Sequence, residues 1–142
     1  MMLYSTVIEQ EDAVCMNSKP LEVLVVDDEV QITELIEIFI KSAGPEAVVH
    51  SFNDALQARE FIASQKKSID VLITDYKMPN VNGIELLELA NPEIKKILIS
   101  GYVSEIAMDK LEQLNAFFFE KPVPMKELSK VVFDNQVDSG PQ

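Results

Sequence analysis

Cysteine, basic side chains and long apolar runs are all scarce in this chain. Its 142 residues contain a single cysteine, Cys15, which cannot form an internal disulfide and fits a reducing cytoplasm as an inert thiol. No apolar stretch approaches the length of a membrane span. Residues 1–12 lack a basic segment and turn acidic early, unlike a secretory signal. We therefore expect a cytoplasmic protein with no membrane insertion.

Basic residues are outnumbered two to one, with 12 of them against 24 acidic residues and a net charge of −12. The longest basic runs are the pairs Lys66-Lys67 and Lys95-Lys96, whereas a nucleic-acid site needs a larger cationic surface. We expect no nucleic-acid partner. The single histidine, His50, has no second histidine or cysteine nearby, so no metal role is expected for it. The acidic surplus should concentrate cations near any acidic cleft.

Strand-like apolar runs alternate with helix-like stripes from residue 21 onward, which predicts an α/β domain with a parallel, doubly wound sheet. Nearly uninterrupted apolar runs are typical of strands covered on both faces. The predicted strands are 21–26, 47–52, 69–75, 96–100 and 116–120. The predicted helices are 30–41, a helix capped by Asn53 or Asp54 and ending at Gln65, 84–90, a capped helix from Ser104 to Leu114, and 125–133.

This alternation gives one domain over residues 20–134, flanked by tails at 1–19 and 135–142 that show no convincing pattern. Met16 lies so close to the first predicted strand that it is a candidate for the native start. The chain ends soon after the last predicted helix, so we expect no separate DNA-binding or catalytic output domain.

Reactive side chains follow four of the predicted strands at the point where each strand ends. They are Asp27-Asp28, Asp75, Ser100 and Lys121. Because the carboxyl ends of parallel strands meet at one edge of a sheet, these carboxylates, hydroxyl and ammonium should converge there. Such a crevice is suited to a divalent cation and a phosphoryl group.

Each of these residues also has a plain structural interpretation. Asp27-Asp28-Glu29 are adjacent carboxylates that repel one another unless a cation such as Mg²⁺ lies between them, but an acidic run before a helix is also a common cap. Ser100, alone, is a turn hydroxyl and Lys121 a solvated lysine.

Asp75 gives a sharper signal, since it ends an apolar strand and a carboxylate there can attack phosphorus. The alternative interpretation is a turn residue. Asp70 illustrates that alternative, because it begins the same run at the opposite edge of the sheet and is expected to be only a turn or solvated residue.

In its order along the chain, this set resembles the receiver domains of two-component response regulators. The resemblance covers about residues 20–134 and rests on Asp27-Asp28, Asp75 with Met78-Pro79 and Gly83, Ser100-Gly101 and Lys121-Pro122. Each piece alone is weak, but the ordered set is specific. It implies a flavodoxin-like fold, with five parallel strands in the order 2-1-3-4-5 and helices on both faces.

The resemblance implies a role for each of these residues. Asp75 would accept a phosphoryl group from a phosphohistidine. Mg²⁺ would be the cofactor, bound by Asp28 and Asp75, with the Lys77 carbonyl as a further ligand and Asp27 acting directly or through water. Lys121 and Ser100 would stabilise the phosphoryl group.

Phe118, three residues before the lysine, occupies the position of the aromatic switch in this family. The resemblance implies that Ser100 moves inward and that the Phe118 ring fills the vacated space; plain core packing is the alternative. The signal would then leave through strand 116–120 and the helices beginning near Ser104 and Met125.

Lys77 and Tyr102 lie two residues after Asp75 and Ser100 and should overhang the site. A bulky Tyr102 would hinder the water that hydrolyses an acyl phosphate, which predicts a long-lived phosphorylated state.

The expected partners are a histidine kinase or histidine phosphotransfer protein and a downstream protein target, and no enzymatic activity is expected beyond self-phosphorylation and self-dephosphorylation. A phosphorelay intermediate that returns the group to a second histidine fits the sequence equally well. A haloacid-dehalogenase-like phosphohydrolase uses similar residues, but it needs a D-x-D spacing on the first strand, whereas Asp27 and Asp28 are adjacent. A silent scaffold would be expected to have gaps in the residue set.

Overall fold

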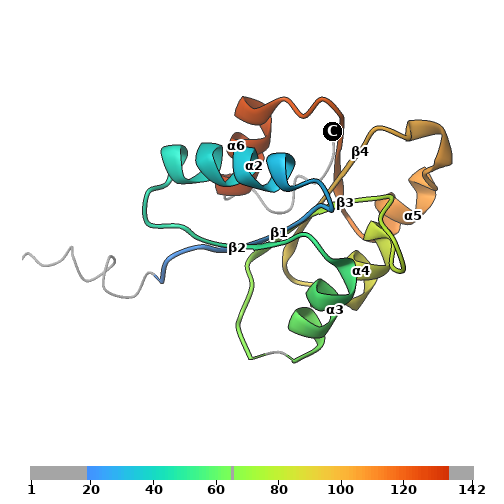
Figure 1. The fold of residues 1–142 in the computed structure, drawn as a ribbon, viewed down its shortest axis with the longest axis horizontal. Helices are drawn as coiled ribbons and strands as arrows, with labels where there is room; N and C mark the ends of the chain where they lie inside the picture. The colour runs from blue at the N-terminus through green and yellow to red at the C-terminus, as the bar shows by residue number, and fades with distance from the viewer. Residues whose placement is uncertain (1–18, 65, 135–142) are drawn as a thin grey trace, which may run out of the picture.

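Five parallel strands form a single sheet at the centre of the molecule (Figure 1). The structure is a computed structural model that describes residues 19–64 and 66–134. The predictions for Cys15, Met16 and most of both tails lie outside the described residues. Within the described part of the chain, no helix is long and apolar enough to cross a membrane.

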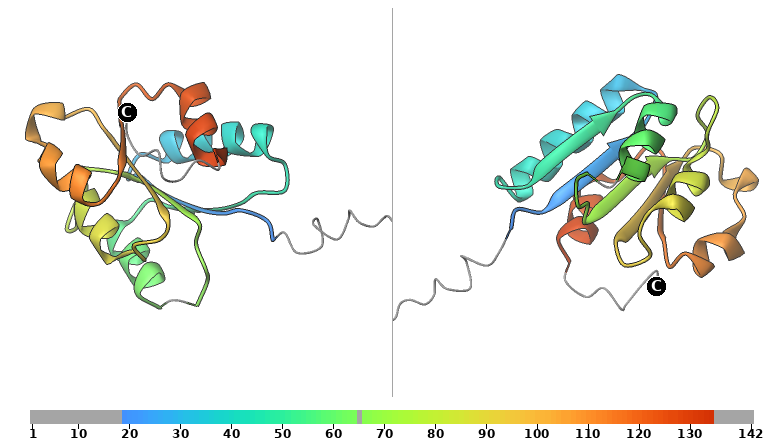
Figure 2. Two further views of the ribbon diagram at one scale, coloured as in Figure 1. Left: turned by 180° about the vertical axis from the view of Figure 1, so that it is seen from behind. Right: turned by 90° about the horizontal axis from the view of Figure 1, so that it is seen from below.

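The order of the strands confirms the predicted fold class. The sheet runs β2-β1-β3-β4-β5, and every neighbouring pair is parallel; the right-hand view of Figure 2 shows the strands side by side. The strands are β1 (Glu22–Val26), β2 (Val48–Phe52), β3 (Val71–Asp75), β4 (Lys95–Ser100) and β5 (Phe117–Glu120). This is the flavodoxin-like order, in which ligands bind at the carboxyl ends of the strands where the order reverses.

Helices cover both faces of the sheet. One face carries α2 (Val30–Ala43) and α6 (Met125–Phe133), and the other carries α3 (Ala55–Ser64), α4 (Gly83–Leu89) and α5 (Met108–Gln113) (Figures 1 and 2). The three central strands are therefore almost fully buried, which explains why their sequences are apolar at nearly every position.

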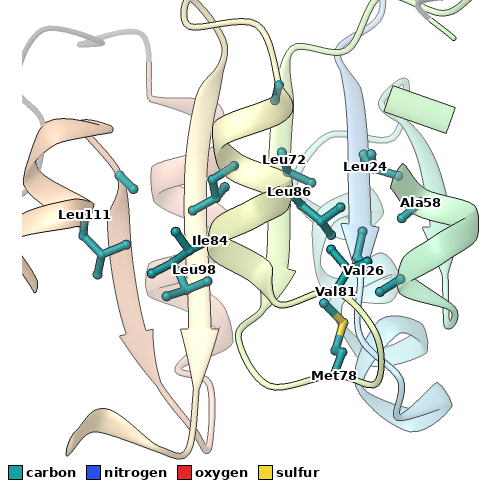
Figure 3. Close-up of a cluster of buried hydrophobic side chains, with 14 of the residues drawn as sticks. Leu24, Val26, Ala58, Leu72, Met78, Val81, Ile84, Leu86, Leu98 and Leu111 are labelled. Atoms are coloured by element: carbon teal, nitrogen blue, oxygen red, sulfur yellow. The ribbon is translucent and has the colours of Figure 1, made fainter. Parts of the chain in front are cut away.

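Alternate residues of each strand enter two separate hydrophobic cores. Val23, Val25 and Ile97 pack under α2 and α6. Leu24 and Leu98 point to the opposite face, where they pack with residues of α3, α4 and α5 (Figure 3).

The predicted capped helix from Ser104 to Leu114 is wrong in its first half. Residues Val103–Glu105 form a short 3-10 turn, and Ile106 then adopts an extended conformation before α5 begins at Met108. The cause is packing, because the Ile106 side chain is only 8% exposed and turns into the core instead of continuing a helical stripe. Ser104 consequently lies inside the 3-10 turn and caps no helix.

The two candidate caps of α3 have separate tasks. The Asp54 Oδ1 atom accepts a hydrogen bond from the Leu56 amide at 2.9 Å, as expected at the start of a helix. Asn53 instead reaches across to the end of β1, where its Nδ2 donates to the Asp27 carbonyl at 2.8 Å. The predicted strand ends are otherwise accurate to within two residues.

Lys95 fastens the end of α6 to the start of β4. Its ammonium donates to the carbonyls of Val131 and Asp134 at the C-terminus of that helix. Its neighbour Lys96 is buried, with 4% of its surface exposed.

Gly83 packs directly against the backbone of the strand that carries Asp75. A Cβ atom at position 83 would lie 2.1 Å from the Asp75 carbonyl oxygen and 2.8 Å from Leu98 Cδ1. The Gly83 amide also donates to the Tyr76 carbonyl at 2.8 Å. The first turn of α4 therefore fixes the backbone at the end of β3, and only glycine leaves enough room for this contact.

Gly83→Ala is expected to lower the free energy of unfolding by about 2 kcal/mol or more, because a backbone oxygen has nowhere to move. Alanine in a helix would otherwise stabilise by up to about 1 kcal/mol. Urea denaturation measures the change. Gly101→Ala is the matched control, since a Cβ there meets nothing nearer than Lys121 Cβ at 3.9 Å. Equal stability of Gly83→Ala and the parent chain would refute the steric account.

Candidate functional site

Four strand ends converge at the carboxyl edge of the sheet. Oxygen atoms of Asp27 and Asp28, which follow β1, and of Asp75, which ends β3, all lie within 4.8 Å of one another. Lys121 follows β5 and places its ammonium among these carboxylates. Ser100, the last residue of β4, is fully buried, and its carbonyl accepts a hydrogen bond from the Lys121 amide at 2.8 Å. The convergence expected from parallel strands is therefore present.

The Lys121 ammonium contacts three carboxylates. It lies 3.0 Å from Asp27 Oδ2, 3.3 Å from Glu29 Oε1 and 3.4 Å from Asp75 Oδ1. Burial would lower the pKa of Lys121, but the close contact with Asp27 and the charges of Asp27 and Asp75 outweigh it and raise the pKa above its ordinary value. Lys121 is thus a fixed positive charge in this site and not a solvated lysine.

Asp27 is fully buried, and its two oxygens have different surroundings. Oδ1 accepts a hydrogen bond from the Glu29 amide at 2.9 Å. Oδ2 faces Lys121 at 3.0 Å but, among the described residues, accepts no hydrogen bond of good geometry. Burial raises the pKa of Asp27 above its ordinary value, against the lowering effects of the Glu29 amide and Lys121.

Asp75 is 5% exposed, and its Oδ1 accepts the Tyr76 amide at 2.9 Å. Burial first, and then the charge of Asp27, raise its pKa from 3.8 to about 6, against the opposing effect of Lys121. Three carboxylates with only one ammonium leave the site short of positive charge.

The donor set fits a magnesium ion. Mg²⁺ takes oxygen ligands and keeps several waters, so two or three carboxylates suffice. The Asp27, Asp28 and Asp75 carboxylates supply them from one cluster, and a buried Asp27 oxygen lacks a hydrogen-bond donor. Asp28 is the exposed member of the three, which leaves this side of the cluster open to solvent.

Asn53 holds the loop that carries Asp27 and Asp28, a role that its position in the sequence does not indicate. Its Nδ2 donates to the Asp27 carbonyl at 2.8 Å and to Thr33 Oγ1 at 3.0 Å, so it joins the start of α3 to the loop between β1 and α2. No local pattern distinguishes such an asparagine from a helix cap, because its partners lie 20 and 26 residues away. Glu29 belongs to the acidic run at the end of β1, but no local pattern indicates its contact with Lys121, 92 residues away.

The proposed switch residues lie on neighbouring strands and share one face. Ser100 pairs in register with Glu120, and Leu98 pairs with Phe118, so Ser100 and Phe118 both face the side of α4 and α5. Phe117 and Phe119 face the other side. The Ser100 hydroxyl accepts the Tyr102 amide at 2.8 Å.

Lys77 and Tyr102 contact each other above the strand ends. The Lys77 ammonium lies 4.7 Å from the centre of the Tyr102 ring and 3.7 Å from Glu105 Oε1. Tyr102 remains 51% exposed.

The remaining candidates have structural partners. Asp70 Oδ2 accepts the Glu22 amide at 2.8 Å at the opposite edge of the sheet, and His50 Nε2 lies 2.7 Å from Glu22 Oε1. A cavity of about 500 Å³ is also found at that opposite edge, lined by residues such as Ile69, Leu72 and Ile94, so it is not part of the acidic site.

Comparisons with known proteins agree with this geometry. The family model of the response regulator receiver domain matches residues 23–133. A protein-glutamate methylesterase/protein-glutamine glutaminase 1 of Rhizobium johnstonii is 42% identical over 71 residues, which cover 50% of this chain and 20% of the relative. The chain therefore spans only a fifth of the length of that relative.

Solved structures give the same result over most of the chain. A response regulator receiver protein from Pseudomonas putida has 27% identity and a TM-score of 0.68, covering 81% of this chain and 97% of that one. A CheY-like receiver domain protein from Methanospirillum hungatei JF-1 has 23% identity and a TM-score of 0.71, covering 85% and 96%, and it supports the fold alone.

Asp75→Asn is expected to stabilise the metal-free protein at neutral pH. The folded chain binds a proton at Asp75 more tightly than the unfolded chain, so the free energy of unfolding falls as pH rises between 3.8 and about 6. Removing this carboxylate should raise the free energy of unfolding by up to about 3 kcal/mol near pH 7.5 in the presence of a chelator. The gain should vanish below about pH 4.

Urea titrations at several pH values measure this difference, with Asp70→Asn at the opposite edge as the control that gains no stability. A gain for Asp75→Asn that does not change with pH would contradict the electrostatic explanation.

Proposed function

Because the chain belongs to the response regulator receiver domain family, we propose that it accepts a phosphoryl group on Asp75 from a phosphohistidine, in a Mg²⁺-dependent reaction. Receiver domains interact with histidine kinases or histidine phosphotransfer proteins, and these are the proposed donors. Family membership also removes the haloacid-dehalogenase-like phosphohydrolase from consideration.

One observation carries the proposal, namely a carboxylate cluster at the strand ends that shares one lysine. Of its three members, Asp75 is the best nucleophile. Both Asp27 oxygens are buried and face the Glu29 amide and Lys121, and Asp28 is exposed at the rim. Asp75 Oδ1 faces Lys121 and the Tyr76 amide, whereas its Oδ2 has no hydrogen-bond partner in the described part of the chain. That oxygen is left to attack phosphorus.

In the proposed transfer, an Asp75 oxygen forms a bond to phosphorus as the phosphorus–nitrogen bond to the donor histidine breaks. The bonding pair returns to the ring nitrogen and, with the other ring nitrogen protonated, the imidazole leaves as neutral histidine. A bound Mg²⁺ would neutralise phosphoryl oxygens during this displacement, held by Asp28 and Asp75, by Asp27 directly or through water, and by the Lys77 carbonyl.

Lys121 would neutralise a further phosphoryl oxygen as a point charge, from a position it already occupies beside Asp75. Ser100 would donate its hydroxyl to the phosphoryl group. Its oxygen now accepts the Tyr102 amide at 2.8 Å, so the movement of Ser100 exchanges that contact for a new one.

The output surface is proposed to be the face of α5, β5 and α6. When Ser100 moves toward Asp75, it vacates space on the face that it shares with Phe118, and the Phe118 ring can move inward. Phenylalanine has no hydroxyl, so this switch works by packing alone. Exposed apolar side chains on the adjoining 3-10 turn and α5, Tyr102, Val103 and Met108, suit a downstream protein target.

The scarcity of exposed basic side chains favours a protein partner over a nucleic acid. Lys96 is buried and Lys95 is used to hold α6, so this lysine pair adds little to a cationic patch. The acidic site is also remote from the cavity of about 500 Å³, which favours a macromolecular donor over a small enclosed substrate.

Incubation with acetyl phosphate and Mg²⁺ is expected to add one phosphoryl group to the protein, as read by intact mass. Asp75→Asn should abolish the gain, and so should chelation of Mg²⁺, because the nucleophile or the charge-neutralising ion is then missing. Asp70→Asn is the control that keeps the gain, since it removes a carboxylate from the other edge. Equal labelling of Asp75→Asn and the parent chain would place the phosphoacceptor elsewhere.

Tyr102→Ala is expected to shorten the lifetime of the phosphorylated state several-fold, because the bulky ring, which lies against Lys77, would hinder the approach of water. Decay of the added mass after removal of the phosphodonor measures the lifetime. Met108→Ala is the matched control, an apolar side chain that is likewise 51% exposed on the same surface. A parent half-life of seconds, or no change in Tyr102→Ala, would refute the shielding role.

A further inference from the structure

Glu29 is the exposed member of the three carboxylates around the Lys121 ammonium. Its Oε1 lies 3.3 Å from Lys121 Nζ, and its side chain is 61% exposed against 19% for Lys121. Asp27 and Asp75, the other two, have side chains that are 0% and 8% exposed. The ammonium therefore bridges two buried carboxylates and one at the surface.

The backbone of Glu29 is held firmly, which gives its side chain a defined reach. Its amide donates to Asp27 Oδ1 at 2.9 Å, and its carbonyl accepts the Ile32 amide at 3.0 Å at the start of α2. The side chain makes no capping hydrogen bond to α2. Within the described residues, the Glu29 carboxylate pairs with Lys121 alone.

The stereochemistry of an ammonium makes this contact consequential. Three carboxylates lie within 3.4 Å of the Lys121 Nζ atom, and of these contacts only the one to Glu29 Oε1 has the geometry of a hydrogen bond. A phosphoryl oxygen that binds Lys121 therefore competes with these carboxylates for the ammonium. The Asp27 side chain is fully buried and cannot exchange Lys121 for water, whereas the exposed Glu29 carboxylate can. Of the two carboxylates that are not phosphorylated, Glu29 is thus the one to yield.

We infer that Glu29 is a positioning residue that holds the Lys121 ammonium in the phosphoryl-free state and competes with the phosphoryl group for it. This inference rests on the proposed phosphorylation of Asp75. Glu29 then slows phosphorylation because its side chain contacts Lys121, and not only because it carries a negative charge.

Two substitutions separate contact from charge. Glu29→Gln removes the charge and weakens the contact. Glu29→Asp keeps the charge but shortens the side chain by one methylene, which takes its carboxylate out of reach of Lys121. Glu34→Gln is the matched control, because it removes an exposed acidic charge from α2 without touching the site.

The test is the rate constant of phosphorylation by acetyl phosphate at saturating Mg²⁺, followed by intact mass. Both Glu29→Gln and Glu29→Asp are expected to be about 2- to 5-fold faster than the parent chain, the size of an exposed ion pair. Glu34→Gln should be unchanged. Added salt should speed the parent chain more than either Glu29 variant, because salt weakens an exposed ion pair.

Several results would overturn the inference. Parent-like rates for Glu29→Asp beside a faster Glu29→Gln would show that charge alone matters. Slower rates for both would show that Glu29 prepares Lys121 for transfer instead of restraining it. If a variant fails to fold by circular dichroism, the salt dependence of the parent chain still decides, and its absence would count against the contact. A parent chain that takes up no phosphoryl group would instead refute the proposed function.

Discussion

The ion pairing of Lys121 makes an acidic edge of the sheet tolerable, and the rest of the site depends on it. Asp27 is fully buried and Asp75 nearly so, and burial disfavours the charged form of each. A single ammonium close to both offsets part of that cost. The backbone holds it there, because the Lys121 amide bonds to the Ser100 carbonyl and thereby ties the end of β5 to the end of β4.

The sheet gives this arrangement its rigidity. Both faces of β1, β3 and β4 are covered, so the strand ends that carry Asp27, Asp75 and Ser100 have little freedom to separate. Gly83 packs against the backbone of Asp75, and Asn53 forms a hydrogen bond to the backbone of the loop after β1. Both contacts restrict the backbone at the strand ends. The side chains of Glu29, Lys77 and Tyr102 remain exposed at the rim of the site.

Much of this could be predicted from the sequence, because the informative signals are local. Apolar strand-length runs that end in Asp, Ser or Lys give both the sheet and the edge at which those residues meet, and the helix at Met125–Phe133 follows from its periodicity. Where local and tertiary demands differ, the sequence was misleading. Ile106 fits a helical stripe but packs as an extended core residue, and Asn53 has the appearance of a cap.

The contacts of Glu29 and Asn53 were unpredictable for a common reason. Each joins elements that are far apart along the chain, and periodicity carries no information on which side chains then meet. The order of the strands was accessible only through the resemblance to a family, since alternation of strands and helices is compatible with several arrangements.

The hydrogen bonds from Lys95 to α6 affect how the molecule unfolds. A helix of nine residues is too short to persist alone, and its last carbonyls are satisfied here by a lysine 36 residues earlier in the chain. Unwinding of α6 would strip those carbonyls of their donor and uncover Leu128 and Val132, along with the apolar face of β4 beneath them. We therefore expect α6 and β4 to open together, so that their backbone amides share a common opening free energy in hydrogen exchange.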